Sequence, residues 1–208
     1  MIAIIDYGVG NLRSVQKAFE RAGARDAVIT HDIEVIRQAE KLVLPGVGAI
    51  RSAVDRLTDM NLIDVIKNEA LSGKPFFGIC VGFQLLFEKS FEFGETLGLG
   101  LIPGTVQRFP ETVKIPQIGW NALKFHSHPM WNGLKDGADV YFCHSFYATP
   151  ADPGVIAAET EYGITYCAAV SKDNIFGVQF HPEKSQTVGL TILNNFINSP
   201  STCWQQDS

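Results

Sequence analysis

Residues 76–87 read Phe76-Phe77-Gly78-Ile79-Cys80-Val81-Gly82-Phe83-Gln84-Leu85-Leu86-Phe87. The apolar run 76–79 predicts a buried strand, and the apolar residues 85–87 predict a helix directly after it. Between the two stands a Gly-x-Cys-x-Gly segment, which has the spacing of the nucleophile elbow Gly-x-Ser-x-Gly with cysteine in place of serine. The stretch therefore favours an α/β fold in which a strand-to-helix turn presents Cys80.

The residues before this stretch alternate short apolar runs with amphipathic helical patterns. Strands are expected at 2–5, 27–30 and 41–44. Helices are expected at 12–21, with Asn11 as the cap, and at 33–39, 49–57 and 62–71. Continuous apolar strands between amphipathic helices imply a mostly parallel sheet that helices cover on both faces.

Beyond about residue 95 the chain changes to glycine and proline turns between β-type runs. Those runs are 104–109, 120–125, 140–147, 155–158, 165–170 and 175–180. They predict strands that extend the sheet in the antiparallel sense, and 190–197 predicts a last helix. We expect one domain over residues 1–198 and a flexible tail over 199–208.

The composition is that of a packed globular protein, with 46% hydrophobic and 19% charged residues in a chain of 208. Lys and Arg number 17 against 22 Asp and Glu, which gives a net charge of −5. No basic patch follows from this balance, so we expect no nucleic-acid partner. The first apolar run stops at Asp6 and is far too short to span a membrane, so no membrane association is expected.

The four cysteines, Cys80, Cys143, Cys167 and Cys203, form no Cys-x-x-Cys pair. Free thiols suit a reducing compartment, and we expect a cytoplasmic protein. The histidines at 126, 128 and 144 lack the spacing of a metal site, so they are interpreted as structural or surface residues. Neither a metal nor a cofactor is expected.

The segment Phe180-His181-Pro182-Glu183-Lys184 follows the apolar run 175–180, where a strand should end. The proline between His181 and Glu183 restricts the backbone, so the carboxylate can orient the imidazole while His181 serves Cys80. A helix N-terminus after Cys80 would favour the thiolate. The plainer alternatives are a buried core cysteine and a solvated His-x-Glu pair.

Pro45-Gly46-Val47-Gly48 breaks the chain after the strand at 41–44. Its glycines tolerate unusual backbone angles, so its amides could donate to an oxyanion. The alternative is an ordinary strand-to-helix turn.

These three blocks, 45–48, 78–87 and 180–184, together resemble those of the class I, triad-type glutamine amidotransferases. More narrowly, the blocks 6–15, 116–121 and 141–147 resemble the glutaminase subunits of imidazole glycerol phosphate synthases, which serve histidine biosynthesis. The resemblance covers residues 1 to about 198. It implies a class I glutamine amidotransferase-like, flavodoxin-like fold: a mixed, mostly parallel central sheet flanked by helices, with an antiparallel extension in the C-terminal half.

The resemblance also assigns roles to individual residues. It makes Cys80 the nucleophile, His181 the acid and base, and Glu183 the carboxylate that orients His181. The remaining assignments are the oxyanion amides of Val47, Gly48 and Val81, the substrate-binding residues Gln84, Glu92 and Ser145, and the partner-interface residues Asn11, Trp120, Tyr141 and Lys184. For several of these a plainer interpretation stays open: Asn11 as a helix cap, Glu92 and Lys184 as solvated charges, and the two aromatic residues as packing.

The implied substrate is L-glutamine, hydrolysed to glutamate and ammonia through a cysteine thioester. The implied partner is a cyclase subunit with a (β/α)8 barrel, in a heterodimer, which uses the ammonia to make imidazole glycerol phosphate and aminoimidazole carboxamide ribotide. The sequence departs from the family's pattern at Gln117, where histidine is expected, and at Cys143, where an aliphatic residue is usual. Neither belongs to the predicted triad.

Three alternatives remain at this stage. The chain could be the glutaminase subunit of another synthase, for pyridoxal phosphate, aminodeoxychorismate or anthranilate. It could be a non-catalytic scaffold subunit with the same fold, although the presence of Cys80, His181 and Glu183 argues against this. A plain cysteine hydrolase is disfavoured by the block that follows Cys80.

Overall fold

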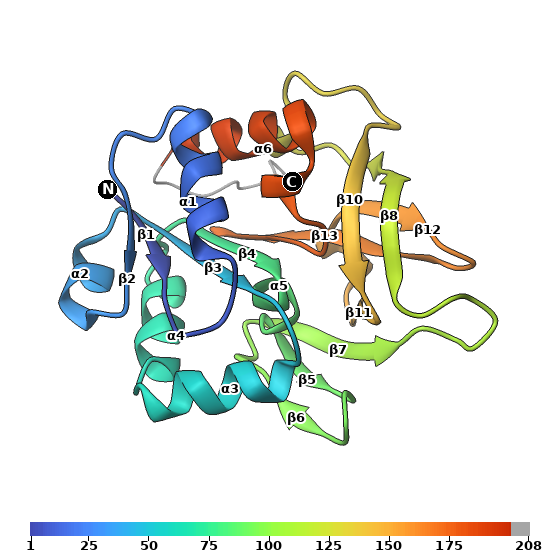
Figure 1. Cartoon of the computed structure of the whole chain (residues 1–208), viewed down its shortest axis with the longest axis horizontal. Coiled ribbons are helices and arrows are strands. Elements are labelled where there is room, and N and C mark those ends of the chain that lie inside the picture. The colour runs from blue at the N-terminus through green and yellow to red at the C-terminus, as the bar shows by residue number, and fades with distance from the viewer. Residues whose placement is uncertain (201–208) are drawn as a thin grey trace.

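The computed structural model describes residues 1–200 (Figure 1). Its helices are α1 (Leu12–Arg21), α2 (Ile33–Gln38), α3 (Ile50–Asp59), α4 (Ile63–Leu71), α5 (Val81–Gln84) and α6 (Gln186–Asn198). Its strands are β1 (Ile2–Ile5), β2 (Ala27–Thr30), β3 (Lys41–Gly46), β4 (Phe76–Cys80), β5 (Phe87–Ser90), β6 (Thr96–Leu97), β7 (Ile102–Arg108), β8 (Gln117–Ala122), β9 (Lys124–Phe125), β10 (Asp139–His144), β11 (Phe146–Pro150), β12 (Ile156–Glu161), β13 (Thr165–Lys172) and β14 (Ile175–Val178).

The first half of the main sheet has the strand order β2-β1-β3-β4-β14, and all of its pairs are parallel. Every residue of β1, β3, β4 and β14 is buried, which explains why these strands are continuous apolar runs in the sequence. Helices α1 and α6 cover one face, and α3 and α4 cover the other (Figure 1). The predicted parallel sheet between helices is confirmed.

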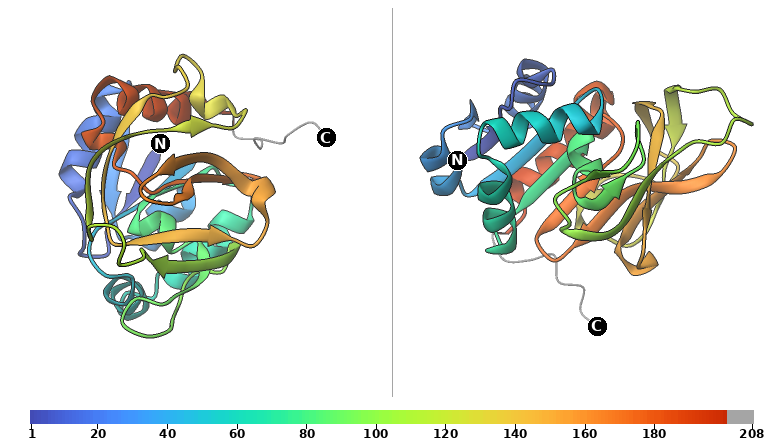
Figure 2. Two further views of the ribbon diagram at one scale, coloured as in Figure 1. Left: turned by 90° about the vertical axis from the view of Figure 1, so that its right-hand side faces the viewer. Right: turned by 90° about the horizontal axis from the view of Figure 1, so that it is seen from below.

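The second half of the sheet continues through β13, β11 and β7, and these neighbours are antiparallel to one another. Figure 2 shows these strands beside the helix-covered half. The edge differs from the prediction, because β5 pairs with β7 in the parallel sense. The run 140–147 was predicted as one strand, but it divides at Ser145: β10 pairs with β8 in a separate antiparallel sheet, whereas β11 returns to the main sheet.

The predicted helix after Cys80 is shorter than expected. Helix α5 ends at Gln84, and Phe87 already belongs to β5. The backbone carbonyls at 85–87 accept hydrogen bonds from the amides of residues 99–102 instead of continuing a helical ladder. A long-range contact therefore overrides the local helical pattern in this segment.

Helix α6 begins at Gln186, four residues before the predicted start. Gly189, which interrupts the apolar pattern, is the reason for the difference. A Cβ at this position would overlap the carbonyl oxygen of Pro182, so only glycine lets the helix pack this closely on the segment 182–184.

None of the helices within residues 1–200 is long and apolar enough to cross a membrane. Cys80, Cys143 and Cys167 are free thiols. Cys203 lies outside the described residues, as does the expected tail apart from Ser199 and Pro200.

Candidate active site

Cys80 stands at the junction between β4 and α5 in a strained backbone conformation, with φ 54° and ψ −105°. The flanking glycines make this turn possible. A Cβ at Gly82 would overlap the carbonyl oxygen of Leu44, and one at Gly78 would come within 2.8 Å of the Gly82 carbonyl oxygen. The turn therefore has the backbone strain and the tight glycine packing of a nucleophile elbow.

His181 follows β14, which lies directly beside β4 in the sheet. Its Nδ1 lies 2.8 Å from Oε1 of Glu183, and the two side chains are only 3% and 4% exposed. Nε2 is then the ring nitrogen left for Cys80. Burial lowers the pKa of His181, but the hydrogen bonds and the charges of Cys80 and Glu183 outweigh it and raise the pKa to about 10. His181 is thus a proton donor at neutral pH.

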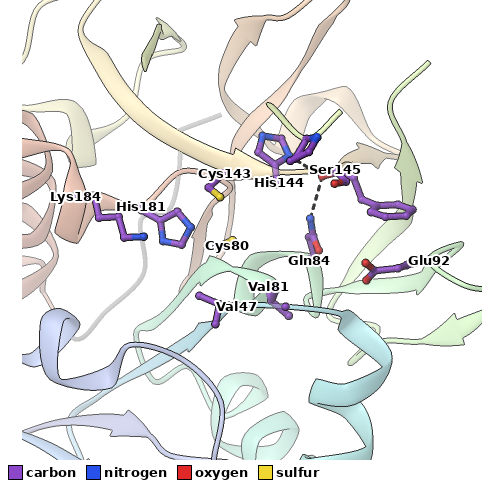
Figure 3. Close-up of a pocket in the computed structure, with 13 residues that line it drawn as sticks. Val47, Cys80, Val81, Gln84, Glu92, Cys143, His144, Ser145, His181 and Lys184 are labelled. Carbon is purple, nitrogen blue, oxygen red and sulfur yellow. Dashed lines mark hydrogen bonds between the residues drawn. The ribbon is translucent and has the colours of Figure 1, made fainter. Parts of the chain in front are cut away.

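A cavity of about 460 Å³ opens above the elbow (Figure 3). Its lining residues are Val47, Gly48, Cys80, Val81, Gln84, Glu92, Pro116, Cys143, His144, Ser145, Phe146, His181 and Lys184. The structure therefore brings together the predicted nucleophile, base, oxyanion segment and substrate-binding residues. Glu183 contributes through His181 and does not line the cavity.

Three adjacent strands place the reactive groups at their carboxyl ends. Gly46, at the end of β3, is in register with Cys80, and Val178, at the end of β14, is in register with Ile79. The carboxyl ends of parallel strands are where open α/β sheets bind ligands. A Cβ at Gly46 would overlap the Tyr7 hydroxyl, which donates to the Pro45 carbonyl oxygen at 2.9 Å.

The far end of the cavity carries hydrogen-bond acceptors. Nε2 of Gln84 donates to the carbonyl oxygen of Phe146 and to Oε1 of Gln179, both at 3.0 Å. Both amide hydrogens are therefore in use, and Gln84 has only its Oε1 to offer to a ligand. Glu92 directs its carboxylate towards Gln84 (Figure 3). Burial raises the pKa of Glu92, although its Oε2 accepts a hydrogen bond from the Ile50 amide at 2.8 Å.

Sequence analysis missed several residues of the site, among them Gln179 and His144. Gln179 is fully buried, and its Nε2 lies 3.9 Å from the sulfur of Cys80. The sequence signal that could have identified Gln179 is its polar side-chain amide within the apolar run 175–180. His144, interpreted as structural or surface, is buried in the cavity wall with its Nδ1 2.8 Å from the Phe146 carbonyl oxygen.

An aromatic surface lies beside the cavity. Trp120 of β8 and Tyr141 of β10 are cross-strand neighbours with ring centroids 6.0 Å apart. Nζ of Lys184 lies 5.6 Å from the Tyr141 ring centroid. Trp120 is 46% exposed, and Ile118 beside it on β8 is also exposed. An exposed apolar group of this kind is typical of a protein-binding surface.

Asn11 lies at the same edge of the sheet, in the turn between β1 and α1. Its side chain accepts a hydrogen bond from the Ser14 amide at 3.4 Å, so its interpretation as the cap of α1 is confirmed. A Cβ at the preceding Gly10 would lie 3.9 Å from Gly46 Cα, which places this turn beside the segment 45–48.

Comparison with known proteins agrees with this geometry. The family model described as glutamine amidotransferase class-I matches residues 3–199. The subunit named imidazole glycerol phosphate synthase subunit HisH from Geobacter metallireducens is 55% identical over 206 residues, covering 95% of this chain and 98% of the relative. The protein of the same name from Aquifex aeolicus is 50% identical, covering 93% and 94%.

Solved structures with less than 25% identity share the fold. A structure titled crystal structure of glutamine amidotransferase aligns with a TM-score of 0.75 at 19% identity, covering 95% of this chain and 97% of the other. The structure of PurLQS from Thermotoga maritima aligns with a TM-score of 0.72 at 21% identity, with the same coverage. The chain belongs to the class-I glutamine amidotransferases and, within them, to the family of imidazole glycerol phosphate synthase HisH subunits.

Proposed function

We propose that this chain is the glutaminase subunit of an imidazole glycerol phosphate synthase and hydrolyses L-glutamine at Cys80. The observation that carries the proposal is the strained Cys80 at the floor of a cavity that His181 also lines, with His181 bonded to Glu183. The names of relatives with about 50% identity support the histidine-pathway synthase over the other synthases that use the same fold.

The first half of the reaction is attack of the Cys80 thiolate on the side-chain amide carbon of glutamine. The carbonyl oxygen becomes an oxyanion, for which the amides of Val81 and of the Val47-Gly48 segment are the proposed donors. His181 gives its proton to the amide nitrogen, the C–N bond breaks, and ammonia leaves. A glutamyl thioester remains on Cys80.

The second half releases the product. His181, now neutral, accepts a proton from a water molecule that attacks the thioester carbon. The C–S bond breaks, glutamate leaves, and the proton on His181 restores the starting pair. Glu183 holds the imidazole in the same orientation throughout, because its carboxylate binds Nδ1 in both protonation states.

The acceptors at the far end of the cavity suit the amino-acid end of the substrate. The carboxylate of Glu92 and Oε1 of Gln84 are assigned to the α-ammonium group, and the backbone around Ser145 to the α-carboxylate. This orientation directs the side-chain amide of glutamine towards Cys80.

Free ammonia at neutral pH is mostly ammonium, which is not nucleophilic, so the product is useful only when it passes directly to an acceptor. The proposed recipient is a (β/α)8-barrel cyclase that docks as a heterodimer partner on the edge carrying Trp120, Tyr141, Lys184 and Asn11. The exposed Trp120 beside the cavity supports this placement.

The test is glutamine hydrolysis by the complex of this chain with its cyclase, comparing Cys80→Ser with Cys143→Ser. Both thiols line the cavity, so the two variants make the same change at neighbouring sites. Cys80→Ser should lose glutamine-dependent activity and keep synthase activity with added ammonium, whereas Cys143→Ser keeps both. Wild-type glutaminase activity in Cys80→Ser would reject the proposal.

Two further experiments address the alternatives. A diazo-ketone analogue of glutamine should label Cys80 alone, as located by peptide mapping; an unlabelled Cys80 would favour a non-catalytic scaffold. Complementation of a histidine auxotroph that lacks its own glutaminase subunit separates the histidine pathway from the other synthases.

A further inference from the structure

A chain of polar contacts connects the glutamine cavity with the sheet that carries Trp120. It consists of five contacts: Asn121 Nδ2 to Glu161 O (3.0 Å), Gln117 Nε2 to Asn121 Oδ1 (2.9 Å), Tyr166 Oη to Gln117 Oε1 (2.8 Å), Tyr166 Oη to His144 Nε2 (3.1 Å) and His144 Nδ1 to Phe146 O (2.8 Å). We call this series the polar chain. Both of its ends are backbone carbonyl oxygens, which can only accept.

The polar chain has fewer protons than contacts. Each contact needs one proton. Each of the four side chains has two neighbours in the polar chain and, in its neutral form, can donate a proton to only one of them. The four side chains are Asn121, Gln117, Tyr166 and His144. Four protons therefore serve five contacts. The carbonyl oxygen at each end can only accept, so both terminal contacts must have a proton. The contact without a proton is therefore one of the three inner contacts of the polar chain.

His144 stays neutral at physiological pH. Burial is the main cause that lowers its pKa; the bond to the Phe146 carbonyl opposes it and the charge of His181 adds to it, and together they bring the pKa to about 4. A neutral imidazole has one N–H, and the short contact with a carbonyl oxygen requires it on Nδ1. Nε2 is then an acceptor, and the single hydroxyl proton of Tyr166 has two possible acceptors, His144 Nε2 and Gln117 Oε1.

The carbonyl that His144 holds is part of the cavity wall. The Phe146 carbonyl oxygen accepts from His144 and from Gln84, which together use both of its lone pairs. His144 and Phe146 flank Ser145, where the chain leaves the β8–β10 sheet for the main sheet. The Nδ1–H bond thus closes the turn around Ser145 and fixes the acceptor that orients Gln84.

We propose that His144 is a positioning residue for glutamine binding: its Nδ1–H holds the Ser145–Phe146 turn, and the Tyr166 hydroxyl selects the tautomer that does so while Gln117 competes for the same proton. The inference rests on the proposed glutaminase function, because glutamine binding is what the turn serves. His144 itself does not contact the bond that breaks.

The first test compares two amide replacements in the complex with the cyclase. In His144→Asn the side-chain amide occupies the position of Nδ1 and can still donate to Phe146, whereas in His144→Gln it occupies the position of Nε2. The KM for glutamine should stay within about twofold of wild type in the first variant and rise about tenfold in the second, with kcat changed less, because one hydrogen bond to the turn is lost. Equal KM values in the two variants would overturn the inference.

The second test uses substitutions of opposite expected effect. Tyr166→Phe removes the donor to Nε2 and should raise KM about threefold, the effect of losing one modest hydrogen bond. Gln117→Met removes Oε1, which competes for the Tyr166 proton, so that His144 Nε2 is the remaining acceptor in the polar chain. This substitution should leave the KM for glutamine unchanged or lower it. Gln117 also contacts Asn121, the neighbour of the proposed cyclase anchor Trp120. The assay therefore uses saturating cyclase, so that a change in cyclase binding does not alter the measured KM. A general loss of packing would raise KM in both variants, and that result contradicts the proposal.

A ¹⁵N NMR experiment on the labelled chain reads the tautomer of His144 directly and does not depend on activity. The proton should reside on Nδ1 in wild type and in Gln117→Met, and it should be less strictly localised in Tyr166→Phe. A proton on Nε2 in wild type overturns the positioning role, whatever the enzyme assay gives. Absence of glutaminase activity in the wild-type complex would instead reject the proposed function.

Discussion

Nδ1 of His181 lies 2.8 Å from Oε1 of Glu183, two residues further along the chain. Both side chains are almost completely buried, so the carboxylate keeps the ring in place and supports its positive charge. The amide in Glu183→Gln has nearly the same shape and no charge. We expect the substitution to lower kcat for glutamine hydrolysis by about 10²–10⁴ and to lower the pKa of His181, as a pH–rate profile would record.

The chain offers a matched control for this substitution. His126 and Glu159 form a second histidine–carboxylate pair, with Nε2 and Oε2 3.2 Å apart, in which His126 is 46% exposed. Glu159→Gln should leave kcat unchanged. An equal loss of activity in the two variants would show that the effect of Glu183→Gln is not specific to the site.

Gly189 lets α6 pack against the peptide that carries His181 and Glu183. In Gly189→Ala the new methyl group overlaps the Pro182 carbonyl oxygen, so the helix and this segment must separate. We expect a loss of roughly 1–3 kcal/mol in the free energy of unfolding together with a lower kcat. Denaturant unfolding and a glutaminase assay measure the two effects. Thr187→Ala changes an exposed residue of the same helix and is the control.

Trp120 is the proposed anchor for the cyclase. Trp120→Ala should weaken binding by roughly 2 kcal/mol, about 30-fold in Kd, as is usual for a buried aromatic residue at the centre of an interface. The control is Leu71→Ala, since Leu71 is 70% exposed and ends α4 just before β4 begins, at the opposite edge of the sheet. Calorimetric titration with the cyclase measures the Kd of both variants. Equal Kd values for Trp120→Ala and Leu71→Ala would place the interface elsewhere.

His128 should make the protein sensitive to acid. Its Nδ1 accepts a hydrogen bond from the Met130 amide at 3.1 Å, and burial lowers its pKa from 6.5 to about 4. Between these two values the unfolded chain binds a proton that the folded chain does not. His128 alone should therefore lower the free energy of unfolding by up to about 1.4 kcal/mol per pH unit as the pH drops from 6.5 to 4.

The non-titrating variant His128→Asn keeps an acceptor at the position of Nδ1, and asparagine is a good cap for the turn that follows. Its stability should decrease less steeply with falling pH than that of wild type, although it loses the contact of Nε2 with Ser171. Urea unfolding at a series of pH values provides the comparison. Parallel curves for the two proteins would contradict the role of His128.

Much of the fold follows from sequence because its central strands are buried on both faces. The runs predicted at 2–5 and 76–79 correspond closely to the fully buried strands β1 and β4. Hydrophobic burial leaves a continuous apolar run that local pattern analysis detects. The His181–Glu183 contact is also local, since the two residues are separated only by Pro182.

The features that sequence analysis missed depend on contacts between distant segments. The end of α5 is set by amides at 99–102, and the division at Ser145 is set by the strands that β10 and β11 select as partners. Gln179 touches Gln84 across 95 positions in the chain, so no local pattern marks it as part of the site. The sequence shows that Gln179 is a polar residue inside an apolar run, but it does not show that Gln84 is its hydrogen-bond partner.

The reactive groups are carried by β3, β4 and β14, which are neighbours in the interior of the sheet rather than at its margins. Insertions or changes in the peripheral loops can therefore accumulate without altering the spacing among the Cys80 sulfur, the His181 imidazole and the proposed oxyanion donors. A common hydrolytic centre can in this way be combined with many different docking surfaces, each specifying a different recipient of the nitrogen.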